Sequence, residues 1–117
     1  MAAITYEVEG ADPINDRESI LARCRQELDA LLHDEEFKQE LKQQNWNDKQ
    51  IKSLTVEPDD TKQELEPTTL LIQIGIAVAV GLTSDAIKAG IKIVARRLQE
   101  RFERTSGHQL TEKKKVD

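Results

Sequence analysis

Apolar residues of this 117-residue chain are concentrated in residues 68–104, whereas the segments before and after this stretch are mostly polar. Near the N-terminus, apolar and polar side chains alternate over residues 4–9, and this period of two predicts a strand with one buried and one exposed face. A similar alternation ends at Pro58, so we expect a second strand over residues 53–56 that pairs with the first. A helical turn over residues 47–54 is the alternative for this segment.

Between these two segments the apolar period changes to three or four residues, which predicts helical structure over residues 15–45. The phase of the apolar stripe changes near His33, so we expect either one bent helix or two successive helices, with Asp34 as the cap of the second. Residues 57–67 contain two of the three prolines and five acidic residues. This composition is typical of a solvated connector.

The uncharged run over residues 68–84 fits two secondary structures. As a strand, the even-numbered residues over 70–82 would share one face, but a strand of thirteen residues would be unusually long. As a helix, the apolar positions continue at steps of three or four residues, or multiples of these, to the end of the apolar stretch. We therefore favour a helix, either one rod over residues 68–104 or two segments that meet at residues 83–85, where a polar side chain can cap the second.

Together these patterns predict an α+β fold, in which a short two-stranded element and an N-terminal helical region pack on a long Gly/Ala-rich C-terminal helix. The alternatives are a mostly α fold, or a fold in which residues 70–81 form a strand. In the long helix Ala86 and Gly90 are four residues apart, a spacing that allows a neighbouring helix to approach closely. We expect a single compact domain over residues 1–107 and a polar, basic tail over residues 108–117.

Composition and charge favour an assembly. Aromatic residues make up only 3% of the chain, so the core must be built from aliphatic side chains, and association with a partner would stabilise such a modest core. The net charge of −5 is unevenly distributed: residues 1–67 carry 17 acidic and 8 basic side chains, whereas residues 68–117 carry 5 acidic and 9 basic ones. This polarity favours contacts between opposite halves of two copies, or contacts with a charged partner.

The chain offers little catalytic chemistry. Cys24 is the only cysteine, and the N-terminus does not resemble a leader segment, so we expect a cytoplasmic protein without a disulfide. His33 and His108 are far apart in the sequence, and neither has a second ligand at the spacing of a metal site. We therefore expect no enzymatic activity and no catalytic, cofactor-binding or metal-binding residues, and the acidic net charge argues against nucleic-acid binding.

These exclusions favour protein–protein interaction, by a non-catalytic adaptor or regulatory subunit that oligomerises or docks on a separate effector. One alternative is a membrane-active protein that inserts residues 70–95 on a signal, since Lys88 and Lys92 border the apolar face of this segment. Another alternative is an inhibitor that contacts its target through the acidic half. The residues expected to form the interaction surface are Ile72, Ile76, Val80, Ile87, Ile91 and Val94.

The order of segments resembles the small effector-associated component domains of bacterial conflict and defence systems. The segments that carry this resemblance are ITYEVEG, LDALLHDEEF, IKSLTVEP and GLTSDAIKAGIKIVARRLQERF. The resemblance covers about residues 3–105 and depends on order and composition, without a diagnostic motif. It implies a non-catalytic companion that recruits or regulates a separate effector, such as a protease, and it carries over no catalytic residues. Those domains end in a strand after the last helix, and the short polar segment SGHQLTEKKKVD does not predict one here.

Overall fold

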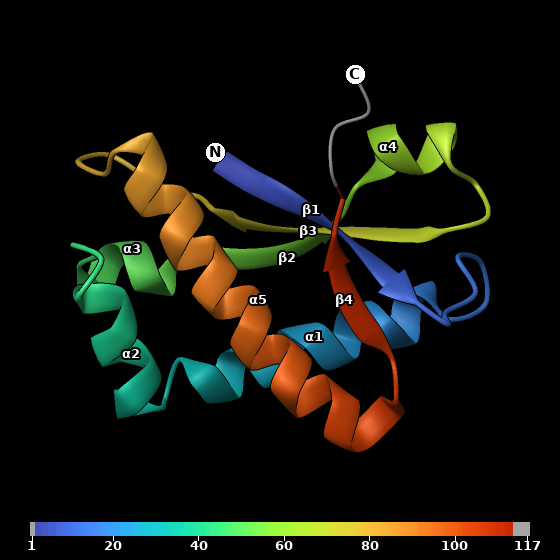
Figure 1. Ribbon diagram of the computed structural model, residues 1–117, viewed down its shortest axis with the longest axis horizontal. Coiled ribbons are helices and arrows are strands. Elements are labelled where there is room, and N and C mark those ends of the chain that lie inside the picture. Colours follow the sequence, from blue (N-terminus) through green and yellow to red (C-terminus); the bar gives the residue numbers. More distant parts are fainter. Residues whose placement is uncertain (1, 114–117) are drawn as a thin grey trace.

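The computed structural model describes residues 2–113 of the chain, apart from the side chains of residues 103, 105 and 106 (Figure 1). The described residues form four strands and five helices, which confirms the predicted α+β class. In chain order the elements are β1 (Ala2–Glu9), α1 (Arg17–Leu31), α2 (Glu35–Lys42), α3 (Asp48–Lys52), β2 (Leu54–Pro58), α4 (Asp60–Leu65), β3 (Leu70–Ile76), α5 (Ser84–Ser106) and β4 (Gln109–Glu112).

The strands form one antiparallel sheet in the order β2-β3-β1-β4. The predicted two-stranded element was therefore too small, and the expected pairing of residues 53–56 with residues 4–9 was wrong because β3 lies between them. β3 pairs with residues 2–8 of β1, from Ala2 opposite Ile76 to Val8 opposite Leu70. β4 is shorter and pairs only with residues 6–9 of β1.

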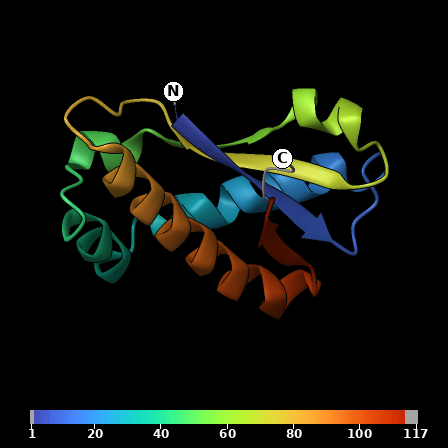
Figure 2. The same ribbon diagram turned by 45° about the horizontal axis from the view of Figure 1, so that its top comes forward.

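The two faces of the sheet differ in what covers them. α1 and α5 cover one face, and α4 lies on the other (Figure 2). Sheet side chains that point toward α1 and α5 form much of the core, and they include Tyr6, Val8, Ile72 and Ile74. On the opposite face Leu71 is buried, whereas other side chains, such as Ala3, Glu7 and Gln73, are at least partly exposed. The helices α1 and α5 and the sheet therefore form two layers, and the opposite face of the sheet is only partly covered, by α4.

Residues 70–76 form a strand, so the helix favoured from the sequence is wrong here and the strand alternative holds for this part. The strand ends at Ile76, so it is seven residues long and not thirteen. Its side chains are buried on both faces of the sheet, except for the half-buried Gln73. A strand buried on both faces has a continuous apolar run, which periodicity alone cannot distinguish from a buried helix. The second expected segment does begin near residue 84, where the Thr83 hydroxyl accepts a hydrogen bond from the Ala86 N–H at 3.1 Å.

The segment over residues 15–58 contains three helices followed by a strand. The stripe over residues 15–45 forms two successive helices, α1 and α2, and Asp34 caps the second by accepting from the Phe37 N–H. Both structures considered for residues 47–58 occur in sequence, since the short helix α3 leads into β2. Asn47 caps α3 in a capping box with Gln50. The expected connector over residues 57–67 contains the short helix α4.

The C-terminal segment is not the tail that the sequence predicts. Gly107 ends α5 in the left-handed conformation with φ of 76°, and the chain then turns back toward β1. Residues 109–112 form β4, in which Leu110 is buried and lies opposite Val8. The expectation that no strand follows the last helix is therefore wrong, because a single buried leucine and the pairing with β1 are enough to fix a four-residue edge strand. Residues 114–117 of the expected tail lie outside the described residues.

Candidate interaction surfaces

The six residues predicted to form the interaction surface have different environments. Ile72 and Ile76 on β3 and Ile91 and Val94 on α5 are fully buried in the core, where the fold brings them together. Ile87 is partly buried against the same core. Val80 lies outside the core, in the loop between β3 and α5, and its side chain is 90% exposed.

The loop over residues 77–82, which we call the apolar loop, is fixed by hydrogen bonds from α3 and the residue that follows it. The Gln50 side chain donates from Nε2 to the Val80 carbonyl at 2.8 Å, and the Val78 N–H donates to the Ser53 hydroxyl at 3.0 Å. The Gln50 side chain is itself buried and accepts from the Asn47 N–H through Oε1. The backbone around Val80 is therefore ordered before any partner arrives.

The apolar loop differs from the other exposed apolar sites. Among the described residues, large exposed hydrophobic side chains occur at Ile14, Leu65 and Val80. Leu65 lies between Glu64 and Glu66, and Ile14 lies close to Asp12 and Asp16, whereas residues 77–83 include no charged side chain. α4, which carries Leu65, and the loop before α5 lie at opposite ends of the molecule in both views. Val80 is thus the exposed hydrophobic side chain with the most apolar surroundings in the sequence.

Trp46 holds the start of α5 next to this loop. Its indole Nε1 donates to the Ala86 carbonyl at 3.0 Å, and its ring packs against Gly90. A Cβ at Gly90 would lie only 2.2 Å from a carbon atom of the ring, so the position requires glycine. The spacing of Ala86 and Gly90 therefore serves the approach of an aromatic ring, and not the approach of a second helix that the sequence suggested.

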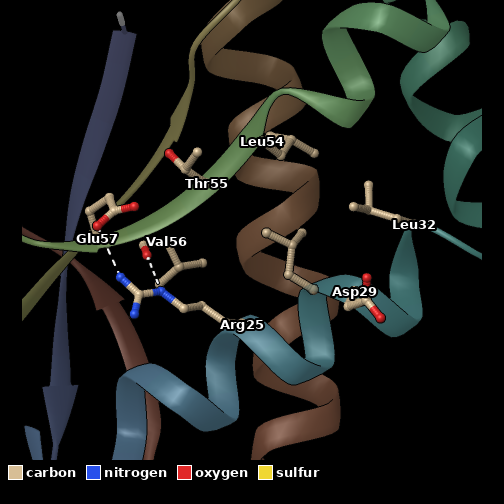
Figure 3. Close-up of a pocket in the computed structure, with 8 residues that line it drawn as sticks. Arg25, Asp29, Leu32, Leu54, Thr55, Val56 and Glu57 are labelled. Carbon is tan, nitrogen blue, oxygen red and sulfur yellow. Dashed lines mark hydrogen bonds and ion pairs between the residues drawn. The ribbon is translucent and has the colours of Figure 1, made fainter. Parts of the chain in front are cut away.

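A second surface is the groove between α1 and the edge strand β2, with a volume of about 250 Å³. Figure 3 shows Arg25 reaching from α1 to β2, with Leu54 and Leu32 further along the groove. The Arg25 Nε donates to the Val56 carbonyl at 3.0 Å, and its Nη2 lies 2.9 Å from a carboxylate oxygen of Glu57. The Val56 carbonyl points away from the sheet, where a further strand would bind. Because Arg25 donates a hydrogen bond to this carbonyl, it hinders another strand from pairing with β2.

Two buried titratable side chains, Cys24 and Tyr6, have raised pKa values. Burial, and next the nearby Glu27, raise the pKa of the Cys24 thiol to about 12. Burial, and next the charge of Glu112, raise the pKa of Tyr6 to about 12. Both shifts favour the neutral forms at ordinary pH.

In the described part of the chain, the two histidines lie against different backbone carbonyls. His33 Nδ1 lies 2.9 Å from the Asp29 carbonyl, whereas His108 Nδ1 lies 3.1 Å from the Glu9 carbonyl. Within residues 2–113, no group of three or more His, Cys, Asp or Glu residues has an arrangement that could hold a metal ion.

Residues 70–95, which the membrane alternative would insert, are divided between the interior strand β3, the apolar loop and the first half of α5. No helix in the described part of the chain is both long enough and apolar enough to cross a membrane. Insertion of this segment would therefore require removal of the strand that pairs with both β1 and β2.

Comparisons with protein-family models, curated proteins and solved structures found no match to this chain.

Sequence reasoning found the segment but not its exposed part. The apolar run was treated as one surface, although the apolar side chains of residues 70–76 are buried and the apolar loop after Ile76 reaches solvent. Gly81, which has a φ of 92°, was the available signal that the run turns before α5. The contacts of Gln50 and Ser53 with the loop join residues 25 to 30 positions apart, and no local pattern predicts them.

Proposed function

We propose that this protein is a non-catalytic interaction module, an adaptor or regulatory subunit that docks on a larger effector or on a second copy through the apolar loop. The observation that carries this proposal is the 90% exposure of Val80 on a backbone held by the side chains of Gln50 and Ser53. This exposure reduces the predicted interaction surface from six residues to Val80 and its neighbours in the apolar loop.

An ordered, exposed apolar loop favours binding in two ways. Burial of one valine side chain at an interface contributes about 1.5 kcal/mol or more. Because the loop backbone is already fixed by hydrogen bonds, association does not have to order it, and less of the binding energy is lost to conformational entropy. Single exposed apolar side chains are common on protein surfaces, so the uncharged stretch around Val80 and its fixed backbone are what distinguish this one.

The resemblance to effector-associated component domains supports the same proposal. Those domains end in a strand after the last helix, and β4 now occupies that position in this chain. The resemblance would make the protein a companion of a separate effector in bacterial defence.

The test is co-purification of tagged variants from the native host, followed by light scattering on a size-exclusion column. We expect the wild-type chain to elute with a stoichiometric partner or as a defined oligomer, and Val80→Asp to elute as a monomer. Leu65→Asp is the matched control, since Leu65 is 78% exposed and lies on α4, and it should retain the complex. Loss of the complex in both variants, or in neither, would contradict docking through the apolar loop.

A further inference from the structure

The two edges of the sheet differ in how far their backbone N–H and carbonyl groups are covered. The β2 edge is covered by Arg25 and ends in Pro58, which has no N–H to offer. At the other edge, β4 pairs with β1 only from residue 6 onward, and the Lys113 N–H adds one more hydrogen bond to the Thr5 carbonyl at 2.9 Å. Among residues 2–113, no strand lies beside residues 2–4 on this side, and the N-terminal part of β1 extends past β4 (Figures 1 and 2).

The register shows which backbone groups face the open side. In an antiparallel pair, residues that exchange backbone hydrogen bonds alternate with residues that do not. The Lys113 N–H donates to Thr5, which lies directly opposite it in the register, so the odd-numbered residues of β1 turn their N–H and carbonyl groups toward β4. Ala3 continues this series beyond the end of β4, and its N–H and carbonyl therefore point to the open edge.

Lysines surround this edge on both sides. A groove of about 530 Å³ runs beside Ala3, Ile4 and Thr5, and we call it the β1 groove. Lys88 and Lys92 of α5 line it from the helical layer. Lys62 of α4 and Lys113, which lies opposite Thr5, line it from the open face of the sheet.

The charges of the β1 groove are only partly balanced. Lys113 forms an ion pair with Glu66 at 2.5 Å, and Glu112 is the acidic residue among the lining side chains. Lys62, Lys88 and Lys92 make no ion pair with any other described residue, although the chain as a whole carries a net charge of −5. Three lysines that have no ion pair within residues 2–113 thus surround one strand edge of an acidic protein, and this favours an anionic ligand.

We propose that the β1 groove binds an extended acidic segment of a partner protein, which adds to the sheet as a strand beside residues 2–4. In such a strand successive side chains point to opposite faces, one set toward Lys88 and Lys92 and the other toward Lys62 and Lys113. Consecutive acidic residues would therefore meet cations on both sides. The same lysines would repel a basic strand, so the groove selects its ligand by charge.

This inference rests on the interaction function proposed above and adds the chemistry of the partner. The apolar loop leads directly into α5, which carries Lys88 and Lys92, so one partner could contact both surfaces. The two contacts differ in their physics, because docking at Val80 is apolar whereas binding in the β1 groove weakens with added salt.

The experiment uses the full chain and a fluorescein-labelled hexaglutamate peptide, with hexaglutamine as the neutral control. Fluorescence anisotropy at low salt and at 0.15 M salt measures the affinity, and NMR measures the exchange of the Ala3 amide proton. The test variant is Lys88→Gln/Lys92→Gln. The matched control is Lys49→Gln/Lys52→Gln on α3, which removes the same charge from exposed positions outside the groove.

We expect hexaglutamate to bind, to bind about tenfold more weakly to the Lys88→Gln/Lys92→Gln variant, and to retain most of its affinity for the α3 control. Bound peptide should slow the exchange of the Ala3 amide. Equal losses in the two double variants would overturn the proposal, since binding would then depend on net charge alone. Binding without protection of Ala3, with equal competition by tripolyphosphate or by anionic phosphatidylserine vesicles, would also overturn it, because the groove would then be a general anion site.

One further outcome separates this inference from the proposed function. If hexaglutamate does not bind while Val80→Asp still loses its complex, the β1 groove proposal fails and docking through the apolar loop stands.

Discussion

Gly90 on α5 packs against the indole ring of Trp46 so closely that a Cβ would lie 2.2 Å from a ring carbon. The indole Nε1 also donates to the Ala86 carbonyl, one turn earlier on the same helix. One aromatic side chain therefore fixes the helix that follows the apolar loop, by a hydrogen bond and by a contact that requires glycine.

This contact predicts that Gly90→Ala destabilises the protein. Alanine favours a helix over glycine by roughly 1 kcal/mol, so helix propensity alone predicts a gain in stability. We expect the collision with Trp46 to outweigh this gain and to lower the free energy of unfolding by about 1–3 kcal/mol. Urea denaturation followed by circular dichroism measures the change, and a variant more stable than wild type would show that the ring moves aside at no cost.

Ile76→Asp and Val80→Asp should separate folding from binding. Ile76 is fully buried in β3, so an aspartate there places a carboxylate in the core and should cost more than about 4 kcal/mol of stability. Val80 is exposed, and Val80→Asp should change stability by no more than about 0.5 kcal/mol. Thermal unfolding measures both, and a Val80→Asp variant that unfolds like Ile76→Asp would mean that the apolar loop supports the fold.

Stability should fall at alkaline pH. The folded protein raises the pKa of Cys24 from 9.0 and that of Tyr6 from 10.0, each to about 12. A group whose pKa is raised on folding stabilises the fold below its unfolded pKa, and this contribution is lost as the pH rises toward the folded pKa. We expect the free energy of unfolding to decrease between about pH 9 and pH 12.

The matched variant for this pH dependence is Tyr6→Phe, which removes one of the two titrating groups. Its free energy of unfolding should depend less steeply on pH above pH 10 than that of wild type. Urea denaturation at a series of pH values measures the slope. An identical slope in the two proteins would show that Tyr6 does not titrate differently in the folded and unfolded states.

Arg25→Ala should expose the β2 edge. The variant frees the Val56 carbonyl and opens the groove beside Leu54, so β2 can pair with the same strand of a second copy. Light scattering should then show more self-association than in wild type. Arg17→Ala, which removes an exposed ion pair with Asp60, is the control and should behave as wild type. Equal behaviour of the two variants would show that Arg25 does not protect the edge.

The sequence predicted the elements whose patterns are local. The alternation over residues 4–9 marked β1, the stripe over residues 15–45 marked α1 and α2, and the polar residues at 83–85 marked the start of α5. Each of these depends on periodicity or capping within a few residues. The α+β class followed from the occurrence of both the strand period of two residues and the helical period of three or four residues in one chain.

The strand β3 was considered from the sequence but not favoured, and β4 was not predicted, for different physical reasons. β3 is buried on both faces, so its continuous apolar run lacks the alternation that identifies a strand with one exposed face. β4 has one buried side chain, Leu110, and its pairing with β1 joins residues about a hundred positions apart, which no local pattern records.

The candidate surfaces depend on such distant contacts. Val80 could be named from the sequence as apolar, but its exposure follows from where β3 ends and from hydrogen bonds with Gln50 and Ser53. The β1 groove combines lysines from α4, α5 and the residue after β4. Only the fold brings these three segments to one edge.

The most direct measurement of docking through the apolar loop is site-specific photo-cross-linking in the native host, with benzoylphenylalanine at position 80 or at position 65. Both positions are highly exposed, so accidental collisions should affect them alike. We predict a cross-linked species of one defined mass from position 80, containing an effector protein or a second copy, and no such species from position 65. The absence of an adduct at position 80, or the same adducts from both positions, would contradict docking through the apolar loop.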